Sequence, residues 1–435
     1  MKKNKTVYIA LTADSLHHGH MNLIEKARKY GDIIIGLLTD KAVAEHKRLP
    51  YLNYEQRKRI LINFKGVSKI VPQKEWDYSH NLKKIRPDYL IHGDDWKTGN
   101  MSIMRKKAIK VLSTYGGKLI EIPYTKGVSS AALIENQNSI SITPDLRRGV
   151  FKRLIDSKKI SRFLETHNPI SALIAEKVSY EKNGKKLSFD GFWSSSLTDS
   201  TTMGKPDTEA LGISERLVGV NQIFDVTTKP LIFDADTGGK IEHFEMKIKS
   251  IERLGISSII IEDKTGLKKN SLLKDTSNQI QENKKKFCEK IKVGKKAQNS
   301  DDFMIIARIE SFILGKKLKD AIDRAHAYVD AGADGIMIHS KSKNPKQIFE
   351  FSNLFRKSYD KIPLVSVPSS YSQVKESELI DNGFNVVIYA NHMLRASYPS
   401  MKNAALKILK HSRSKEIDKE IFGINEILNL IPGTN

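Results

Sequence analysis

Acidic side chains follow directly after apolar runs in the second half of the sequence, where they could bind a metal ion. Asp234 and Asp236 come after the apolar run 231–233, and Glu262 ends the largely β-branched run 256–262. Alternate residues of an extended segment point to the same side, so Asp234 and Asp236 project together. Oxygen-only ligation suits Mg²⁺, which also keeps several waters and binds substrate oxygens. These carboxylates therefore predict a magnesium site at the ends of neighbouring strands.

The loop after Glu262 combines basic and amide side chains with a glycine. Residues 264–271 read Lys-Thr-Gly-Leu-Lys-Lys-Asn-Ser, so that Lys268 and Asn270 follow a strand that ends in acid. Such a segment is either a charged surface loop or part of a metal or phosphate site, and alone it favours neither. Because other acidic strand ends lie nearby, we expect a lid that closes on an anionic substrate and keeps water from it.

Further polar side chains near predicted strand ends suit an anionic substrate. Arg308 offers a rigid fork to a carboxylate or phosphate, and His339 can donate a hydrogen bond to the same group. Successive backbone N–H groups in Trp193-Ser-Ser-Ser-Leu197 could cradle a carboxylate. Asp207 lies in a loop that contains glycine and proline, and could serve as a nucleophile or as a clamp.

The motif His17-His-Gly-His20 lies where the first predicted strand turns into a helix. Free N–H groups and the helix dipole at such a turn attract phosphate, and Gly19 lets the backbone approach closely. Two imidazoles can donate hydrogen bonds to the charge that grows on a transferring phosphoryl group. The histidines could instead cap the helix or form half of a metal site, but no third ligand stands at a suitable spacing. Phosphate chemistry is the favoured interpretation.

Eight short apolar runs alternate with helical stretches from residue 147 onward. This alternation is typical of a (β/α)₈ barrel, in which the strand ends meet at one face. Acidic, arginine and histidine side chains recur after successive runs, so we expect them to share one site. The predicted strands are Phe163–Glu165, Asp190–Trp193, Leu231–Phe233, Ser258–Ile261, Met304–Ala307, Gly335–Ile338, Leu364–Val367 and Val386–Tyr389.

The first 135 residues predict a separate, smaller α/β unit. Apolar runs alternate with helical stretches here too, which indicates a Rossmann-like parallel sheet with crossover helices. Ligands of such a sheet bind beyond the carboxyl ends of the strands, where His17, His20, Asp40, Asp94 and Asp95 are expected. The predicted strands are 6–11, 32–38, 69–71, 89–91 and 118–122.

The chain of 435 residues is long enough for two domains with separate cores. We place the first domain at 1–135 and the barrel domain at 147–435. The segment 136–146 is polar with one proline and is expected to be the linker. The single cysteine, Cys288, excludes an internal disulfide framework and a cysteine-built zinc site.

The formal net charge of +23 raises the possibility of a nucleic-acid-binding protein. The lysines are scattered, however, and no nucleic-acid-binding signature accompanies them, so this class is a remote alternative. A basic surface also suits anionic small substrates. No apolar run approaches the length of a spanning helix, and the N-terminus lacks the hydrophobic region of a signal peptide. We expect a cytoplasmic protein without membrane or nucleic-acid partners.

Motifs of the first domain resemble the cytidylyltransferase family of nucleotidyltransferases, which has glycerol-3-phosphate and phosphocholine members. The resemblance covers about residues 5–135. The matching motifs are Asp14-Ser-Leu-His17-His-Gly-His20, Thr39-Asp40, Gly93-Asp94-Asp95-Trp96-Lys97 and, at the position of a second signature, Ser129-Ser130. The resemblance implies that a substrate phosphate or phosphonate attacks the α-phosphorus of CTP and releases pyrophosphate, with magnesium.

The resemblance also implies roles for residues of this domain. His17 and His20 would stabilise the transition state, and Lys47 would bind the substrate phosphate. Asp94 and Trp96 would lie in the nucleotide and substrate pocket, and Ser129 with Ser130 would contact the triphosphate. The sequence departs from the family where Leu11-Thr-Ala13 replaces Gly-Thr-Phe and where Ala131 replaces a threonine. These departures bear on the choice of nucleotide more than on the reaction type.

The second domain resembles the phosphoenolpyruvate mutase branch of the isocitrate lyase superfamily over nearly all of residues 145–400. Its most specific motif is Glu262-Asp-Lys-x-x-x-Lys268-x-Asn270-Ser271. The family's reaction moves the phosphoryl group of phosphoenolpyruvate from oxygen to carbon and forms the C–P bond of phosphonopyruvate. The supporting motifs are Phe192-Trp-x-Ser195, Asp234-x-Asp236, Ala307-Arg308-x-Glu310 and His339-Ser-Lys341.

This second resemblance implies a division of labour among the site residues. Asp234 would bind Mg²⁺ directly, and Asp236, Glu262 and Glu310 would act largely through its waters. The remaining roles are substrate binding by Trp193, Arg308, His339 and the backbone around Ser195, Ser196 and Leu197, phosphoryl contact by Asp207, and lid closure by Lys268 and Asn270. Ser194 and Ser196 stand where glycines are common.

Two enzymes of the same superfamily remain as alternatives. C–C lyases use a cysteine in the loop after the metal-binding strand, and residues 264–271 contain none. A phosphonopyruvate hydrolase would share the fold, the metal and the anion sites, although Lys268 and Asn270 favour the mutase. Together the two resemblances imply phosphonate biosynthesis by a bifunctional enzyme, with 2-aminoethyl- or 2-hydroxyethylphosphonate as examples of the CMP acceptor. We expect a homo-oligomer, because barrels of this superfamily commonly assemble through their helices.

Overall fold

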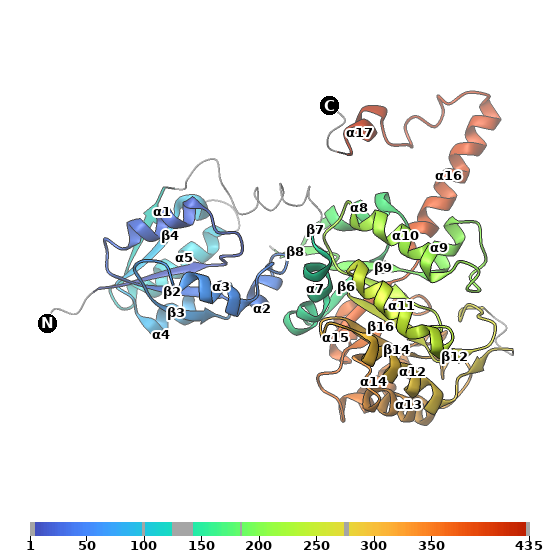
Figure 1. The fold of residues 1–435 in the computed structure, drawn as a ribbon. Helices are drawn as coiled ribbons and strands as arrows, with labels where there is room; N and C mark the ends of the chain where they lie inside the picture. Colours follow the sequence, from blue (N-terminus) through green and yellow to red (C-terminus); the bar gives the residue numbers. More distant parts are fainter. Residues whose placement is uncertain (1–4, 98–100, 124–141, 183–184, 274–277, 432–435) are drawn as a thin grey trace.

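The computed structural model describes residues 5–97, 101–123, 142–182, 185–273 and 278–431. They form a five-stranded parallel sheet with its helices and a closed barrel of eight parallel strands (Figure 1). Both units confirm the predicted fold class. No helix in the described part of the chain is long and apolar enough to cross a membrane.

The N-terminal sheet has the strand order β3-β2-β1-β4-β5, with every pairing parallel. Its central strand is buried, and Val7, Ile9 and Ile33 lie in the core. The apolar runs explain this burial, because strands covered by helices on both faces must be apolar on both. The elements are β1 (Thr6–Leu11), α1 (His18–Ala27), β2 (Asp32–Leu38), α2 (Asp40–Ala44), α3 (Tyr54–Leu61), β3 (Val67–Gln73), α4 (Ser79–Ile85), β4 (Tyr89–Gly93), η1 (Asp94–Lys97), α5 (Met101–Ser113) and β5 (Lys118–Ile122).

The barrel closes in the order β10-β11-β14-β15-β16-β17-β6-β9. All eight predicted strands are present, and β11 is buried along its whole length. The strands are β6 (Ser161–Glu165), β9 (Gly191–Ser194), β10 (Leu231–Asp234), β11 (Ser258–Glu262), β14 (Met304–Ile309), β15 (Gly335–Ile338), β16 (Leu364–Ser366) and β17 (Val386–Tyr389). Two small hairpins flank it: β7 (Ser179–Lys182) with β8 (Lys185–Ser188), and β12 (Lys264–Thr265) with β13 (Ile280–Gln281).

Helices with one apolar stripe surround the barrel. In α11, for example, Phe244, Ile248 and Ile251 are buried, the spacing of one helical face. The helices are α8 (Pro169–Lys177), α9 (Ser196–Thr202), α10 (Ile213–Phe224), α11 (Ile241–Leu254), α12 (Lys284–Ala297), α13 (Leu318–Asp330), α14 (Lys346–Arg356), α15 (Glu376–Asp381), α16 (His392–His411) and α17 (Ile424–Leu428).

Helix α7 (Pro144–Ser157) begins inside the segment that the sequence predicts as a linker. Pro144 lies in the first turn of the helix, where the backbone N–H has no partner within the helix, so its absence loses no hydrogen bond. The proline therefore begins a helix and does not mark an extended linker. The part of the predicted linker at 136–141 lies outside the described residues. The helix is anchored to the barrel by Phe151, which is fully buried against Phe163, and by the buried Arg147, which donates to carbonyl oxygens of the segment 224–229.

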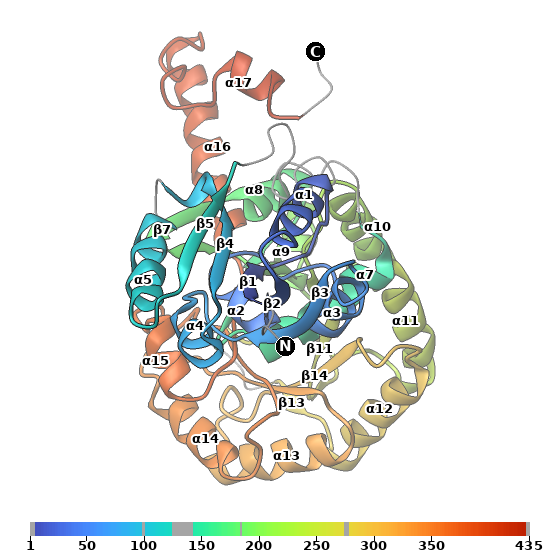
Figure 2. The same cartoon turned by 90° about the vertical axis from the view of Figure 1, so that its left-hand side faces the viewer.

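The N-terminal domain lies over one end of the barrel, and helices α10 to α15 ring that end (Figure 2). At the opposite extreme of the chain, α16 projects away from the barrel and leads to α17 (Figure 1). No residue of α16 is buried against the described part of the chain. Leu409 and Tyr398, for example, keep 77% and 66% of their surface exposed.

Candidate active sites

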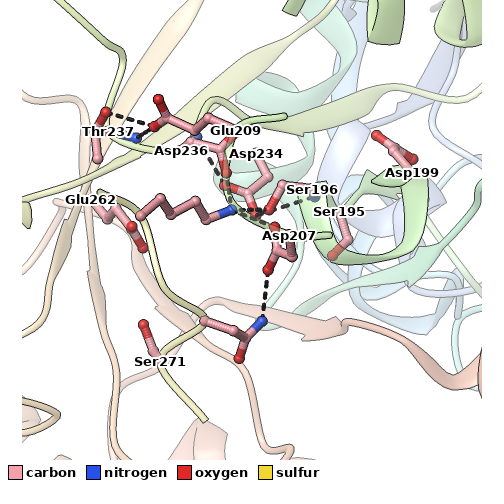
Figure 3. A network of polar contacts seen from close by, with 12 residues as sticks. Ser195, Ser196, Asp199, Asp207, Glu209, Asp234, Asp236, Thr237, Glu262 and Ser271 are labelled. Carbon is pink, nitrogen blue, oxygen red and sulfur yellow. Dashed lines mark hydrogen bonds and ion pairs between the residues drawn. The ribbon is translucent and has the colours of Figure 1, made fainter. Parts of the chain in front are cut away.

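The predicted metal carboxylates Asp234 and Asp236 lie at the carboxyl end of β10. Asp234 accepts hydrogen bonds from the backbone N–H (3.1 Å) of Asp236 and from the hydroxyl (3.1 Å) of Ser196. Asp236 has a φ of 55°, a left-handed conformation that residues other than glycine adopt mainly where surrounding structure demands it. Figure 3 shows Asp207, Asp234, Asp236 and Ser196 close together, with Glu262 to one side. The barrel therefore gathers these side chains as predicted.

Two residues of the predicted lid contact this group directly. The Lys268 amine donates to Asp207 (2.7 Å), to Asp236 and to the Ser196 hydroxyl (2.5 Å). The Asn270 amide donates to the other oxygen of Asp207 at 2.8 Å. The surrounding carboxylates outweigh the effect of burial and raise the pKa of Lys268, so that its amine stays charged. Asp207 is thus held between the two lid residues.

A second cluster lies at the ends of β14 and β15. Arg308 donates to Glu310 (2.6 Å) and to the Ser271 hydroxyl (2.8 Å), and its guanidinium lies 3.0 Å from Nδ1 of His339. Although burial favours the neutral acid, the charges of Arg308 and His339 hold the pKa of Glu310 well below its usual range. Ser271 also donates to Glu310, so the end of the lid is tied to this cluster.

Glu262 lies between the two clusters and is almost fully buried. Its Oε1 atom makes no hydrogen bond and lies 3.3 Å from the Lys264 amine, and its Oε2 atom lies 3.3 Å from the Arg308 guanidinium. Burial raises the pKa of Glu262 to about 7, against the charges of Arg308 and Lys264. A buried carboxylate oxygen without a hydrogen-bond donor is suited to a cation or to its bound water.

The residues present fit a magnesium ion, though not a closed protein cage. In the described residues, no three His, Cys, Asp or Glu side chains come close enough to hold a metal by themselves. Mg²⁺ commonly takes only one or two protein carboxylates and completes its shell with waters and substrate oxygens. Asp234, Asp236, Glu262 and Glu310 offer oxygen donors only, which agrees with this preference.

The segment predicted to cradle a carboxylate forms the start of α9. Ser195 is the residue before the helix, and the first-turn N–H groups of a helix attract anions. The Ser196 N–H points toward Asp234 at 3.4 Å. Trp193 is buried, and its indole N–H has no hydrogen-bond partner within the described structure. Leu197 is partly buried beside them.

Two residues that the sequence analysis missed hold this site together. Arg216 of α10 is fully buried as a side chain and donates to the backbone oxygens of Ser194 and Asp234 and to Asp199 (2.9 Å). It therefore joins the ends of β9 and β10 to α9. Glu209 accepts from the hydroxyl (2.8 Å) and backbone of Thr237, which fastens the Asp207 loop to the end of β10 (Figure 3).

The predicted histidine pair begins α1 in the N-terminal domain. His17 Nδ1 accepts from the Gly19 N–H at 3.1 Å, and His20 Nδ1 accepts from the His17 N–H at 3.3 Å. A neutral imidazole that accepts at Nδ1 carries its proton on Nε2. Burial, then the proximity of His17, lowers the pKa of His20 to about 4, so it is neutral at pH 7. The histidines cap the helix, and each also keeps an Nε2–H group with which to bind an oxyanion.

The other residues predicted for this domain divide into two groups. His17, His20, Lys47 and Asp95 line one cavity of about 1540 Å³. Trp96 is fully buried: it stacks on His92 with a ring separation of 3.9 Å, and its N–H donates to Glu121. The cavity is lined by His92 and Asp95, while Asp94 and Trp96 are not among its lining residues. Ser129 and Ser130 lie outside the described residues.

Asp40 was expected near a ligand, but its carboxylate pairs with two arginines of the protein. It accepts from the fully buried Arg57 at 2.6 Å and from Arg153 of α7 at 3.1 Å. The cavity around His17 also reaches the barrel, where residues just before β6, β9 and β10 line it, among them Lys158, Asp190 and Lys229. The His17 site therefore faces the N-terminal ends of the barrel strands.

The fold and the two sites are those of a two-domain α/β enzyme of small-molecule substrates. The chain belongs to the phosphoenolpyruvate phosphomutase family, whose model matches residues 151–409. Residues 12–136 match the cytidylyltransferase-like family. The two matches support a bifunctional enzyme with mutase and nucleotidyltransferase domains, as the sequence motifs predict.

Similar proteins represent both domains. The phosphoenolpyruvate phosphomutase of Tetrahymena pyriformis is 33% identical over 280 residues, which cover 64% of this chain and 89% of the relative. A phosphonopyruvate hydrolase of Variovorax sp. is 33% identical over 278 residues, covering 63% and 91%. The glycerol-3-phosphate cytidylyltransferase of Bacillus spizizenii is 30% identical over 131 residues, covering 30% of this chain and 94% of that protein.

Solved structures resemble the barrel. A phosphoenolpyruvate phosphomutase from Streptomyces platensis subsp. rosaceus has a TM-score of 0.60 and 32% identity, and the match covers 66% of this chain and 95% of that one. A phosphonopyruvate hydrolase in complex with oxalate and Mg²⁺ has a TM-score of 0.58 and 30% identity, with the same coverage. Members of this superfamily thus bind magnesium.

Proposed function

We propose that the barrel interconverts phosphoenolpyruvate and phosphonopyruvate. The bond from phosphorus to the enol oxygen breaks and a bond from phosphorus to C3 forms, so no other reactant is consumed. Asp234 would hold Mg²⁺ directly, with Asp236, Glu262 and Glu310 acting through its waters. Bound Mg²⁺ would neutralise charge on substrate oxygens. Arg308 and His339 would bind the substrate's charged groups, while Trp193 and the amides of Ser195, Ser196 and Leu197 would bind its carboxylate end.

The proposal rests on the hydrogen bonds between the lid, residues 264–271, and Asp207. Lys268 and Asn270 contact one oxygen each of this carboxylate, so a closed lid fixes its orientation. A migrating phosphoryl group is short-lived in water, and a site closed by the lid protects it. Asp207 could bind the phosphoryl group covalently or guide it as it moves from oxygen to carbon. A C–C lyase would need a cysteine base in the lid, but Cys288 lies on α12, outside residues 264–271. Its thiol is 3.4 Å from the Ala327 carbonyl oxygen.

The N-terminal domain, in the same proposal, transfers CMP from CTP to a small phosphonate such as 2-aminoethyl- or 2-hydroxyethylphosphonate. A phosphonate oxygen attacks the α-phosphorus, the bond to the β-phosphate breaks, and pyrophosphate leaves. The Nε2–H groups of His17 and His20 would stabilise charge on the phosphate oxygens. Lys47 lines the same cavity and would bind the acceptor. Asp94, Ser129 and Ser130 remain the predicted nucleotide contacts in this proposal, whereas Trp96 would support the cavity wall from behind through its stacking on His92.

The mutase is distinguished from the hydrolase by ³¹P NMR of the full chain with Mg²⁺ and phosphonopyruvate. We expect the phosphonopyruvate signal to be replaced by that of phosphoenolpyruvate, because the equilibrium lies on that side. Inorganic phosphate with stoichiometric pyruvate would instead identify a phosphonopyruvate hydrolase. A second sample with CTP and each candidate phosphonate should release pyrophosphate.

We also propose that the chain forms a homo-oligomer through α16. This helix projects from the barrel, and apolar side chains such as Tyr398, Met401 and Leu409 are exposed along it. Burying them against a second copy would remove apolar surface from water. Light scattering should give a multiple of the chain mass of 49.2 kDa. A monomer at micromolar concentration would contradict the proposal.

A further inference from the structure

The segment between α2 and α3, residues 45–53, carries two of the cations that line the His17 cavity. This 45–53 loop contains Lys47 and Arg48, both of which line the cavity with His17 and His20. Arg48 donates to Asp14 at 2.8 Å, and the Tyr51 N–H donates to the other oxygen of Asp14 at 2.7 Å. Because Asp14 precedes His17 by three residues, the loop and the histidine turn are connected through one carboxylate.

The opposite side of the same loop is held by the barrel domain. Arg153 of α7 donates to the carbonyl oxygens of Pro50 (2.7 Å) and Tyr51 (2.9 Å), and its guanidinium pairs with Asp40 at 3.1 Å. A planar guanidinium can reach several acceptors at once in a fixed geometry, which an amine cannot reproduce. The loop is therefore fastened at its backbone by a side chain from another domain.

Apolar packing reinforces this contact. Leu154 of α7 is buried together with Ala44 and Leu49, with Val150 packed against them. Val150, Arg153 and Leu154 share one face of the helix because they are spaced by three and four residues. Arg147 and Phe151, which adjoin these residues on the helix surface, are anchored in the barrel. Helix α7 thus transmits a rigid position from the barrel to the loop.

We propose that Arg153 is a positioning residue for the nucleotidyltransferase site, acting through the 45–53 loop. The inference rests on the proposed CMP transfer by the N-terminal domain. Arg153 touches no substrate; it sets where Lys47 and Arg48 present their charges to the acceptor. Small displacements of positioning groups reduce rates strongly, so the loop must be held to well under an ångström or so. The barrel is in this sense a structural part of the transferase.

The test compares Arg153→Ala with Lys152→Ala in the full chain. Lys152 is the neighbouring cation on α7, and its amine donates to the backbone oxygen of Asp301 in the barrel at 2.9 Å. Arg153→Ala should raise KM for the phosphonate about tenfold while kcat and KM for CTP change less than about threefold. Added guanidinium should restore part of the loss, whereas Arg153→Lys should not. Lys152→Ala should behave as wild type, and mutase turnover should be unchanged in both variants.

Hydrogen exchange separates failure of this inference from failure of the proposed activity. The Tyr51 amide, bonded to Asp14, should exchange faster in Arg153→Ala than in wild type or Lys152→Ala. If wild type releases no pyrophosphate with any phosphonate, the proposed activity fails, and exchange alone decides whether Arg153 holds the loop. Unchanged exchange in residues 45–53, or equal increases of KM for CTP and phosphonate, would overturn the positioning role.

Discussion

Replacing Asp234 with alanine is expected to lower kcat/KM of the mutase reaction by about 10³-fold, with transferase activity within about twofold of wild type. A bound metal ion is worth several kcal/mol of charge stabilisation, and about 4 kcal/mol corresponds to about 10³-fold in rate. Asp234 also accepts hydrogen bonds from Ser196 and from the Asp236 backbone, so its loss loosens neighbouring site groups. ³¹P NMR measures the mutase, and pyrophosphate release measures the transferase.

A second variant distinguishes lost charge from lost structure. Asp234→Asn keeps the size of the side chain and one oxygen, which can accept the hydrogen bond from either Asp236 or Ser196, but it removes the negative charge. It should lose nearly as much mutase activity. The control is Asp330→Ala, an exposed acid on α13. Loss of both activities in Asp234→Asn would mean that the two sites are not independent, and retention of mutase activity would remove Asp234 from the proposed metal site.

Replacing His17 is expected to lower kcat of the transferase by about 10² to 10³-fold, the usual cost of removing one donor to a developing oxyanion. Mutase activity should not change, because His17 lies in the other domain. His17 has two roles in the structure, since its Nδ1 caps α1 while its Nε2–H remains for a ligand. The measurement is initial-rate pyrophosphate release with saturating CTP and phosphonate.

The choice of substitution separates these two roles. Asparagine caps helices well, so His17→Asn should keep the start of α1 intact. If phosphate binding is the important role, His17→Asn and His17→Ala should lose similar activity. Recovery of activity in His17→Asn alone would assign His17 to capping. His18→Ala is the control, because His18 is the exposed neighbour.

Much of the barrel site could be predicted because strand ends leave a plain signal. Buried strands read as apolar runs, and the first polar residue after each run lies at the functional face of a barrel. Asp234, Glu262, Arg308 and His339 were placed in this way, and the structure brings their strand ends together. The position of Lys268 could not be predicted from strand ends alone, because it depends on the path of a loop that folds back over the strands.

Arginines that organise the structure were not predicted, although the sequence contains a signal for them. Arg216, Val220 and Ile223 are buried at one-turn and two-turn spacings of α10, so the arginine stands on the apolar stripe of its helix. In α7, Arg147 likewise stands on the apolar stripe, one turn before Phe151 and two turns before Leu154. A charged residue on an apolar stripe must find buried partners, but which partners it finds depends on tertiary packing.

Residues 144–146 and Trp96 show two other limits of prediction. A proline among polar residues suits both a linker and the first turn of a helix, and only the packing of α7 on the barrel decides between them. Trp96 belongs to a motif that implies a pocket residue, yet its ring is stacked on His92 inside the domain. Motif position does not determine which way a side chain points.

The position of the His17 cavity relative to the barrel affects how a product of one site could reach the other. The proposed mutase residues follow the strands of the barrel, whereas this cavity meets the residues that precede them. Under the proposed activities, a product of the barrel site would approach the His17 cavity from the opposite end of the barrel, so each site is expected to respond to the bulk concentration of its own substrate. Phosphonopyruvate differs from the proposed acceptors by a carboxylate and a ketone, so the proposed route would need decarboxylation and conversion of the ketone between the two sites. Because both domains lie on one chain, the proposed first and last activities of such a route would be present in a one-to-one ratio. Other proteins would supply the steps between them.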